Sequence, residues 1–261
     1  VKTLPDVEIA GLYFSGNTGY SDNYEVFSSP FGLMDVSDAI LILSDKSISK
    51  DLVKIILRKS KPVYLKPVPN LHISEIRELV DLEKEAGIVT SVYNPFTYHP
   101  WFDPFRNKYE KPFLINLRSC FDNLVIKPAH EMLLLITALS RLTQSNYKKV
   151  DVFGIKRNTG GDLISVRLEY ENGCVINLTL AQECEQGFCE ILQSSATVRF
   201  EIKQSLYQAY PHISQEYHAV KNFVELIMNQ DKKNNSFDGL MQGVQIVHEI
   251  KEHLRFNGID F

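Results

Sequence analysis

Short apolar runs alternate with helical patterns through the first part of the chain, and this alternation constrains the fold more than any other feature. The apolar runs lie at residues 7–14, 38–43, 63–65 and 88–93. Between them, residues 51–59 and the segment from Ser74 to Gly87 place apolar side chains at helical spacing. Ser74 is expected to cap the second helix, and Gly87 suits its left-handed end. Such alternation is typical of βαβ units, so we expect a parallel sheet in an α/β domain.

The pattern changes after residues 94–111, which are rich in proline and aromatic side chains and are expected to stop regular elements. A strand and a largely apolar helix are predicted next, at 113–119 and 129–142. Further strands are predicted at 150–156, 163–170, 174–181, 188–193 and 197–202, with final helices at 215–228 and 238–254. Asn172-Gly173 favours a hairpin, because both residues tolerate positive φ. We therefore expect an α/β domain over residues 1–97 and an α+β domain, with a mostly antiparallel sheet, over residues 98–261.

Charge and hydropathy exclude two classes of partner. Lys and Arg together number 28, Asp and Glu number 32, and the formal net charge is −4. Without a basic stripe the chain is not expected to bind nucleic acid. The longest apolar runs, at 39–43 and 132–136, are far shorter than the ~20 residues that span a bilayer. We expect a soluble protein that does not bind a membrane.

The four cysteines give a weaker indication of the compartment. Cys120, Cys174, Cys184 and Cys189 show neither CxxC spacing nor the density of a small secreted framework. We therefore interpret them as buried or bystander thiols and expect a cytoplasmic location. A cleaved signal peptide remains an alternative, because the chain begins at Val1 without an initiator Met. No metal site is predicted, since His248 and His253 lie five residues apart on a helix and do not converge.

Three segments in a fixed order carry a resemblance to a known family. Residues 61–68 read Lys-Pro-Val-Tyr-Leu-Lys-Pro-Val and precede a helix that ends in Glu85-Ala86-Gly87 and a further strand. Residues 38–43 form an apolar run upstream, and Pro128-Ala129-His130 precedes the long apolar helix. This order resembles the glucose-fructose oxidoreductase and inositol dehydrogenase (Gfo/Idh/MocA) family. The family's signature is a strand ending in Glu-Lys-Pro, an amphipathic helix and a second strand.

The resemblance implies a fold, a reaction class and a set of site residues. It implies a truncated Rossmann-like N-terminal domain, an α+β substrate domain, NAD or NADP as cofactor, a sugar or polyol as substrate, and a homodimer formed through the C-terminal sheet. Lys66 would be the catalytic acid or base, with His130 beside it. Ser15, Ser44 and Pro67 would lie on the cofactor side. The alternatives are a solvated strand-end residue for Lys66 and a structural hydrogen-bonding residue for His130.

Several positions depart from the family's pattern. Leu65 stands where the family has Glu, and Ile126 stands where it has Asp. Residues 14–17, Phe-Ser-Gly-Asn, replace the acidic residue that would bind the ribose hydroxyls. No GxGxxG follows any strand. Residues 1–6 resemble the tail of the family's first helix, so we expect the glycine turn to lie upstream of residue 1.

Two functions of different class follow from these matches and departures. The first is an oxidoreductase whose glycine turn is supplied by residues upstream of the printed chain. The second is a non-catalytic relative that binds a sugar or a partner protein. Lys66 and His130 favour the first, and the changes at Leu65, Ile126 and Ser15 favour the second.

Overall fold

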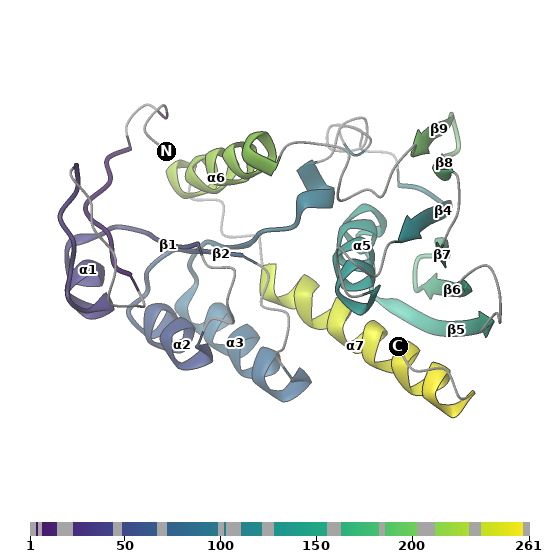
Figure 1. The fold of residues 1–261 in the computed structure, drawn as a ribbon, viewed down its shortest axis with the longest axis horizontal. Coiled ribbons are helices and arrows are strands. Elements are labelled where there is room, and N and C mark those ends of the chain that lie inside the picture. The colour runs from purple at the N-terminus through teal and green to yellow at the C-terminus, as the bar shows by residue number, and fades with distance from the viewer. Residues whose placement is uncertain are drawn as a thin grey trace. The chain divides into compact units, whose positions relative to one another are not determined.

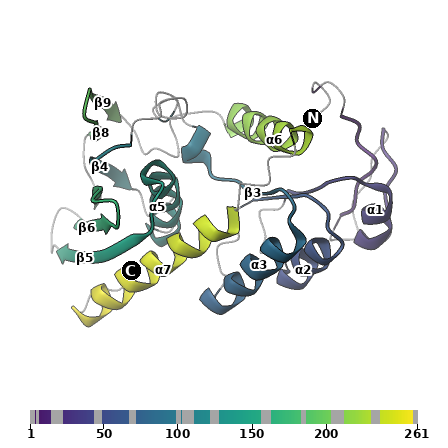
Figure 2. The same cartoon turned by 180° about the vertical axis from the view of Figure 1, so that it is seen from behind.

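The computed structural model describes residues 4, 7–14, 23–43, 49–66, 72–98, 102, 111–121, 128–155, 163–182, 186–202, 212–229 and 236–257. The chain divides into two compact units. The first comprises Val1–Tyr93 with Glu216–Asp238, and the second comprises Asn94–Gln215 with Gly239–Phe261. Figures 1 and 2 show their elements from two sides. No helix in the described ranges is long and apolar enough to cross a membrane.

The first unit is built on a parallel sheet, as predicted. Its strands β1 (Ile40–Ile42), β2 (Val63–Leu65) and β3 (Thr90–Val92) lie in this order. Ile42 is in register with Leu65, and Leu65 with Val92, so the carboxyl ends of the strands are aligned. Figure 1 and Figure 2 show α2 (Lys50–Arg58) and α3 (Ile73–Ala86) on one face of the sheet and α6 (His212–Met228) on the other. Covered on both faces, β2 is fully buried.

The predicted helices of this unit form, with a correction at one cap. Gly87 ends α3 in the left-handed conformation, with φ of 60°, as expected. The N-cap of α3 is His72 and not Ser74. The cause is Glu75, whose carboxylate accepts a hydrogen bond from the His72 N–H at 3.0 Å and so fixes the start of the helix two residues earlier.

The strand predicted at residues 7–14 is wrong. Among the described residues of that segment only Leu12 forms a bridge, with Val26 opposite it. The Leu12 N–H donates to the Glu25 carbonyl and the Leu12 carbonyl accepts from the Phe27 N–H, both at 2.8 Å. Gly11 lies so close to the Phe27 ring that an added Cβ would be 2.4 Å from it. Residues 7–14 therefore do not extend the sheet, and Tyr13 and Phe14 are exposed.

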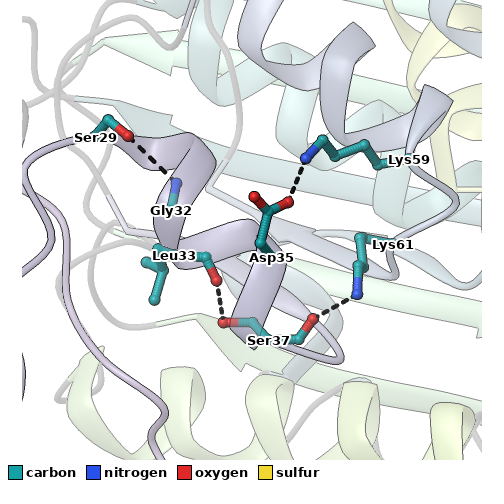
Figure 3. A network of polar contacts seen from close by, with 7 residues as sticks. All are labelled: Ser29, Gly32, Leu33, Asp35, Ser37, Lys59 and Lys61. Carbon is teal, nitrogen blue, oxygen red and sulfur yellow. Dashed lines mark hydrogen bonds and ion pairs between the residues drawn. The ribbon is translucent and has the colours of Figure 1, made fainter.

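A short helix that sequence reasoning did not predict, α1 (Pro30–Val36), lies beside the end of α2. The Ser29 hydroxyl caps it by accepting a hydrogen bond from the Gly32 N–H at 3.3 Å. Figure 3 shows how two lysines hold its other end: Lys59 pairs with Asp35, and Lys61 donates to the Ser37 carbonyl at 2.8 Å. These contacts fix α1 against the turn between α2 and β2.

The second unit holds a six-stranded sheet that is mostly antiparallel, as predicted. Its strands run in the order β5-β6-β7-β4-β8-β9, and only the pair β4 and β7 is parallel. Their bounds are Leu114–Phe121 for β4, Tyr147–Ile155 for β5, Leu163–Tyr170 for β6, Val175–Gln182 for β7, Gly187–Leu192 for β8 and Thr197–Ile202 for β9. The hairpin between β6 and β7 forms as predicted, with φ of 86° at Gly173.

Helix α5 (Pro128–Thr143) forms where the sequence predicts it and is apolar on most of its surface. A 3-10 helix, η1 (Pro95–Tyr98), occupies part of the segment that was expected to be irregular. Asn94 accounts for it, because its side chain accepts from the Phe96 N–H at 3.0 Å and donates to the Leu134 carbonyl of α5 at 2.8 Å. The last helix, α7 (Ser236–Phe256), belongs to the second unit from Gly239 onward.

Two glycines of α7 give a matched test of the α5–α7 contact. A Cβ at Gly243 would lie 2.4 Å from the Thr137 hydroxyl oxygen, whereas a Cβ at Gly239 would meet nothing within 4 Å. We expect Gly243→Ala to lower the free energy of unfolding by about 1–3 kcal/mol, because α5 and α7 must move apart. Gly239→Ala should raise it by about 0.5–1 kcal/mol, because alanine favours the helix. Urea denaturation followed by circular dichroism measures both, and equal effects would contradict the close helix contact.

Candidate functional site

Lys66 lies at the carboxyl end of β2, where the first unit's parallel strands end together. Its N–H donates to the Ile42 carbonyl at 3.3 Å, which continues the pairing of β1 with β2 by one residue. Its Nζ lies 3.2 Å from a carboxylate oxygen of Glu216, and the two side chains are 23% and 38% exposed. The carboxyl edge of a parallel sheet is where ligands bind in open α/β folds. A cation and an anion that both reach solvent are therefore positioned at the edge expected for a ligand.

Glu216 is the residue of this pair that sequence reasoning missed. It lies on α6, far from Lys66 along the chain, and belongs to the first unit with the rest of Glu216–Asp238. No local sequence pattern identifies Glu216 as part of a site. The sequence of a helix shows which of its faces is apolar, but it does not show which sheet that face packs against. Leu65, at the family's Glu position, is 1% exposed within the sheet. The carboxylate beside Lys66 thus comes from α6.

Three buried aromatic side chains pack next to the Lys66 segment. The Tyr64 ring, next to Lys66 in the chain, lies 5.8 Å from the Phe223 ring of α6 and 6.4 Å from the Tyr93 ring. Tyr93 follows β3, and its N–H donates to the Leu65 carbonyl at 2.6 Å. All three rings are buried. They hold β2, β3 and α6 together and so position Lys66 and Glu216.

His130 lies in the first turn of α5, in the second unit. Burial lowers the pKa of its imidazole, which favours the neutral ring. Its Nδ1 is buried and has no hydrogen-bond partner among the described residues. Lys66 belongs to the first unit, so the prediction that Lys66 and His130 face one cleft stays a prediction.

A second carboxyl group that the sequence did not single out lies beside His130. Glu131 is 2% exposed and accepts a hydrogen bond from the Ser119 hydroxyl of β4 at 3.2 Å. Burial raises the pKa of Glu131 to about 7, against the lowering effect of the Ser119 hydrogen bond. A carboxyl that titrates near neutrality can both donate and accept a proton under ordinary conditions. Neighbouring positions of α5 thus carry two titratable groups perturbed by burial.

The three residues predicted on the cofactor side, Ser15, Ser44 and Pro67, lie outside the described residues. A dinucleotide needs a glycine turn between a strand and a helix for its pyrophosphate. Gly11 and Gly32 instead pack against the Phe27 side chain, and Gly87 ends α3. The described part of the first unit therefore offers no glycine turn that fits a dinucleotide.

The described residues contain no group of three His, Cys, Asp or Glu side chains that could hold a metal ion. Cys174 and Cys189 are free and buried, as expected, and burial raises their pKa values to about 11 and about 12. Cys120 is disulfide-bonded, which corrects the expectation that it is a thiol.

Comparison with known proteins finds likeness in structure only. No protein-family model and no curated protein matches the sequence. UDP-N-acetylglucosamine 3-dehydrogenase GnnA from Acidithiobacillus ferrooxidans matches with a TM-score of 0.64 and 14% identity, over 88% of this chain and 84% of that one. Scyllo-inositol dehydrogenase from Lactobacillus casei, solved with NAD(H) and scyllo-inositol, matches with a TM-score of 0.67 and 14% identity, over 90% and 83%.

A third structure extends this comparison. GenD2 from gentamicin A biosynthesis, in complex with NAD, matches with a TM-score of 0.65 and 12% identity, over 90% of this chain and 81% of that one. At such low identity the matches establish the fold and no more. The resemblance noted in the sequence is thereby confirmed at the level of structure: the chain has the fold of the glucose-fructose oxidoreductase and inositol dehydrogenase type of dehydrogenase.

Proposed function

We propose that this protein is an oxidoreductase that acts on a sugar or a polyol, with Lys66 and Glu216 receiving the hydroxyl group that is oxidised. The observation that carries the proposal is their 3.2 Å ion pair at the carboxyl end of β2. Two of the structural neighbours are named for sugar or polyol substrates, which supports the substrate class.

The chemistry proposed for this pair concerns the proton of the substrate. Oxidation of an alcohol to a carbonyl compound removes a proton from oxygen and a hydride from carbon. As the ammonium group of this ion pair, Lys66 would donate a proton to the carbonyl oxygen in the direction of reduction. In the direction of oxidation, its amine form would accept the hydroxyl proton on Nζ and re-form the ion pair with Glu216. His130, kept neutral by burial, would serve beside it as predicted from the family. The hydride acceptor would be NAD or NADP; two of the similar structures contain NAD or NAD(H).

A non-catalytic role is the second candidate, and two observations favour it. The described residues offer no glycine turn for a dinucleotide. Leu65 is enclosed in the sheet at the position where the family has a carboxylate. In this case the protein would bind a sugar or polyol at Lys66 and Glu216 without oxidising it.

The test of the proposal is ligand binding to matched lysine variants. We expect scyllo-inositol or UDP-N-acetylglucosamine, used as probes, to bind the wild-type chain in calorimetric titration. Lys66→Ala should weaken binding by about 10-fold to 100-fold, because a hydrogen bond to a charged group is lost. Lys59→Ala is the control, since Lys59 forms an ion pair with Asp35 at the end of α2. Equal affinity in wild type and Lys66→Ala for every probe bound would contradict the site.

The same samples separate the two candidates. With NAD or NADP at millimolar concentration, an oxidoreductase raises the absorbance at 340 nm, and Lys66→Ala lowers that rate by roughly 10²-fold to 10⁴-fold. Binding of the probe without any change in absorbance supports the non-catalytic role.

We also propose a homodimer formed through the outer face of the second unit's sheet. Three half-buried polar side chains on neighbouring strands form a hydrogen-bonded row on this face. Asn177 donates to Asn116 at 2.9 Å, and Asn116 donates to Glu190 at 3.1 Å. Light scattering at micromolar concentration is expected to give the mass of two chains for the wild type and of one for Asn116→Arg. Asn257→Arg, at the exposed end of α7, should leave the dimer intact. A wild-type monomer would contradict this interface.

We also propose a cytoplasmic location. A cytoplasmic location is in keeping with the two free, buried thiols Cys174 and Cys189. The disulfide of Cys120 weighs against it, because disulfides are rare in reducing compartments.

A further inference from the structure

A buried carboxyl group of α3, in contact with the start of α7, takes no part in the Lys66 site. Glu83 lies in the last turn of α3 and is 1% exposed. Its Oε1 accepts a hydrogen bond from the Thr90 hydroxyl of β3 and another from the Phe237 N–H at 3.5 Å. Glu83 therefore joins α3, β3 and the first turn of α7, all within the first unit.

The hydrogen bonds of this cluster all run toward Glu83. Thr90 has a single hydroxyl proton, and it donates this proton to Glu83. The Ser236 hydroxyl, 3.0 Å from the Thr90 hydroxyl, must then donate to Thr90. Ser236 and Phe237 begin α7, where N–H groups have no acceptor within the helix. The whole cluster thus donates toward one carboxyl oxygen, which caps the helix from outside.

Burial and hydrogen bonding act in opposite directions on the pKa of the Glu83 carboxyl group. The other oxygen, Oε2, is buried without a hydrogen-bond partner in the part of the chain that the structure describes. Burial raises the pKa of Glu83 to about 7, while the Thr90 and Phe237 hydrogen bonds oppose the rise. The charged groups nearby are Asp238, which raises it further, and Lys84, which lies 3.5 Å from Asp238 in an ion pair.

We propose that Glu83 is a proton-operated latch that holds the first turn of α7 against α3 and β3 when protonated and releases it more often when ionised. Ser236–Asp238 belong to the first unit and the following residues of α7 to the second, so the latch acts where the chain passes between units. Gly239, next along the helix, has open space around its Cβ position and a low helix propensity. The first turn can therefore open without disrupting packed side chains at that glycine.

The sign of the pH effect follows from the two states of Glu83. Released, the carboxyl group meets water and its pKa returns toward the ordinary value of 4.5, whereas in the held state it is about 7. The held state binds more protons between these values. Holding is therefore strongest below about pH 4.5, weakens as the pH rises to about 7, and changes little above it.

Hydrogen exchange of the full chain tests the latch. Protection of the Phe237 and Leu240 backbone amides, corrected for intrinsic exchange, is expected to fall roughly 20-fold between pH 5.5 and 7.5 in the wild type. Glu83→Gln keeps the shape of the side chain without its titration, and should remove this pH dependence. Glu85→Gln is the control, because Glu85 is exposed on the same helix turn and should leave the dependence unchanged.

A second variant keeps the proposal testable if Glu83→Gln fails to fold. Thr90→Val removes the hydroxyl group that stabilises the ionised form and should move the NMR titration midpoint of the Glu83 side-chain carboxyl carbon upward. The same pH dependence of Phe237 protection in wild type and Glu83→Gln would overturn the latch. An unchanged midpoint in Thr90→Val would overturn it as well.

Discussion

Replacing Phe223 with alanine is expected to lower the free energy of unfolding of the first unit by about 3–5 kcal/mol. The Phe223 side chain is fully buried on α6, and its ring lies 5.8 Å from the Tyr64 ring of β2. Truncation leaves a cavity between α6 and the parallel sheet, which the surrounding side chains fill only in part. The same ring holds α6 where Glu216 reaches Lys66, so probe binding at Lys66 should weaken along with stability.

A neighbouring aromatic residue provides the control for this prediction. Tyr217 lies on the same helix and is 37% exposed, so Tyr217→Ala should cost less than about 1 kcal/mol. Urea denaturation gives the free energies, and exchange of the β2 backbone amides reports the first unit separately. If Phe223→Ala costs no more than Tyr217→Ala, then α6 does not pack against β2 as described.

A polypeptide of the 261 printed residues is expected to bind NAD and NADP with a Kd weaker than about 100 μM. Dinucleotides are held in such folds mainly at the pyrophosphate, by N–H groups of a glycine turn and the following helix N-terminus. Each missing hydrogen bond to a charged group costs about 1.5–3 kcal/mol, so losing two or three weakens a micromolar site by several powers of ten. Calorimetric titration with each cofactor measures this directly.

The outcome of that titration also bears on the proposed function. A Kd of about 100 μM or tighter would show that residues outside the described ranges form a cofactor site, and it would favour the oxidoreductase. Ser15, Ser44 and Pro67 would then be the first positions to substitute. Weak binding together with retained affinity for a polyol would favour the non-catalytic role.

The sequence by itself determined most of the regular elements and the fold class. The strands around Ile40, Val63 and Thr90 and the helices between them were predicted correctly, because burial on both faces of a parallel sheet leaves continuous apolar runs. Gly87 and Gly173 marked a helix end and a hairpin, because positive φ is a local requirement. Lys66 was placed at a strand end by the same local reasoning. Hydrophobic periodicity and turn preferences depend on a few neighbouring residues, so a single amino-acid sequence is enough to identify them.

Only the tertiary structure decided which distant segments meet. The sequence predicted α6 as a helix, but gave no sign that Glu216–Asp238 returns to the first unit and brings a carboxylate to Lys66. It likewise did not single out Glu83, whose unusual environment comes from Thr90 and from the start of α7. A charged residue on a helix reads as solvated unless its neighbours in space are known. Pairing and burial between segments far apart in the chain depend on which elements pack together. Periodicity marks the apolar face of a helix but not the partner that this face meets.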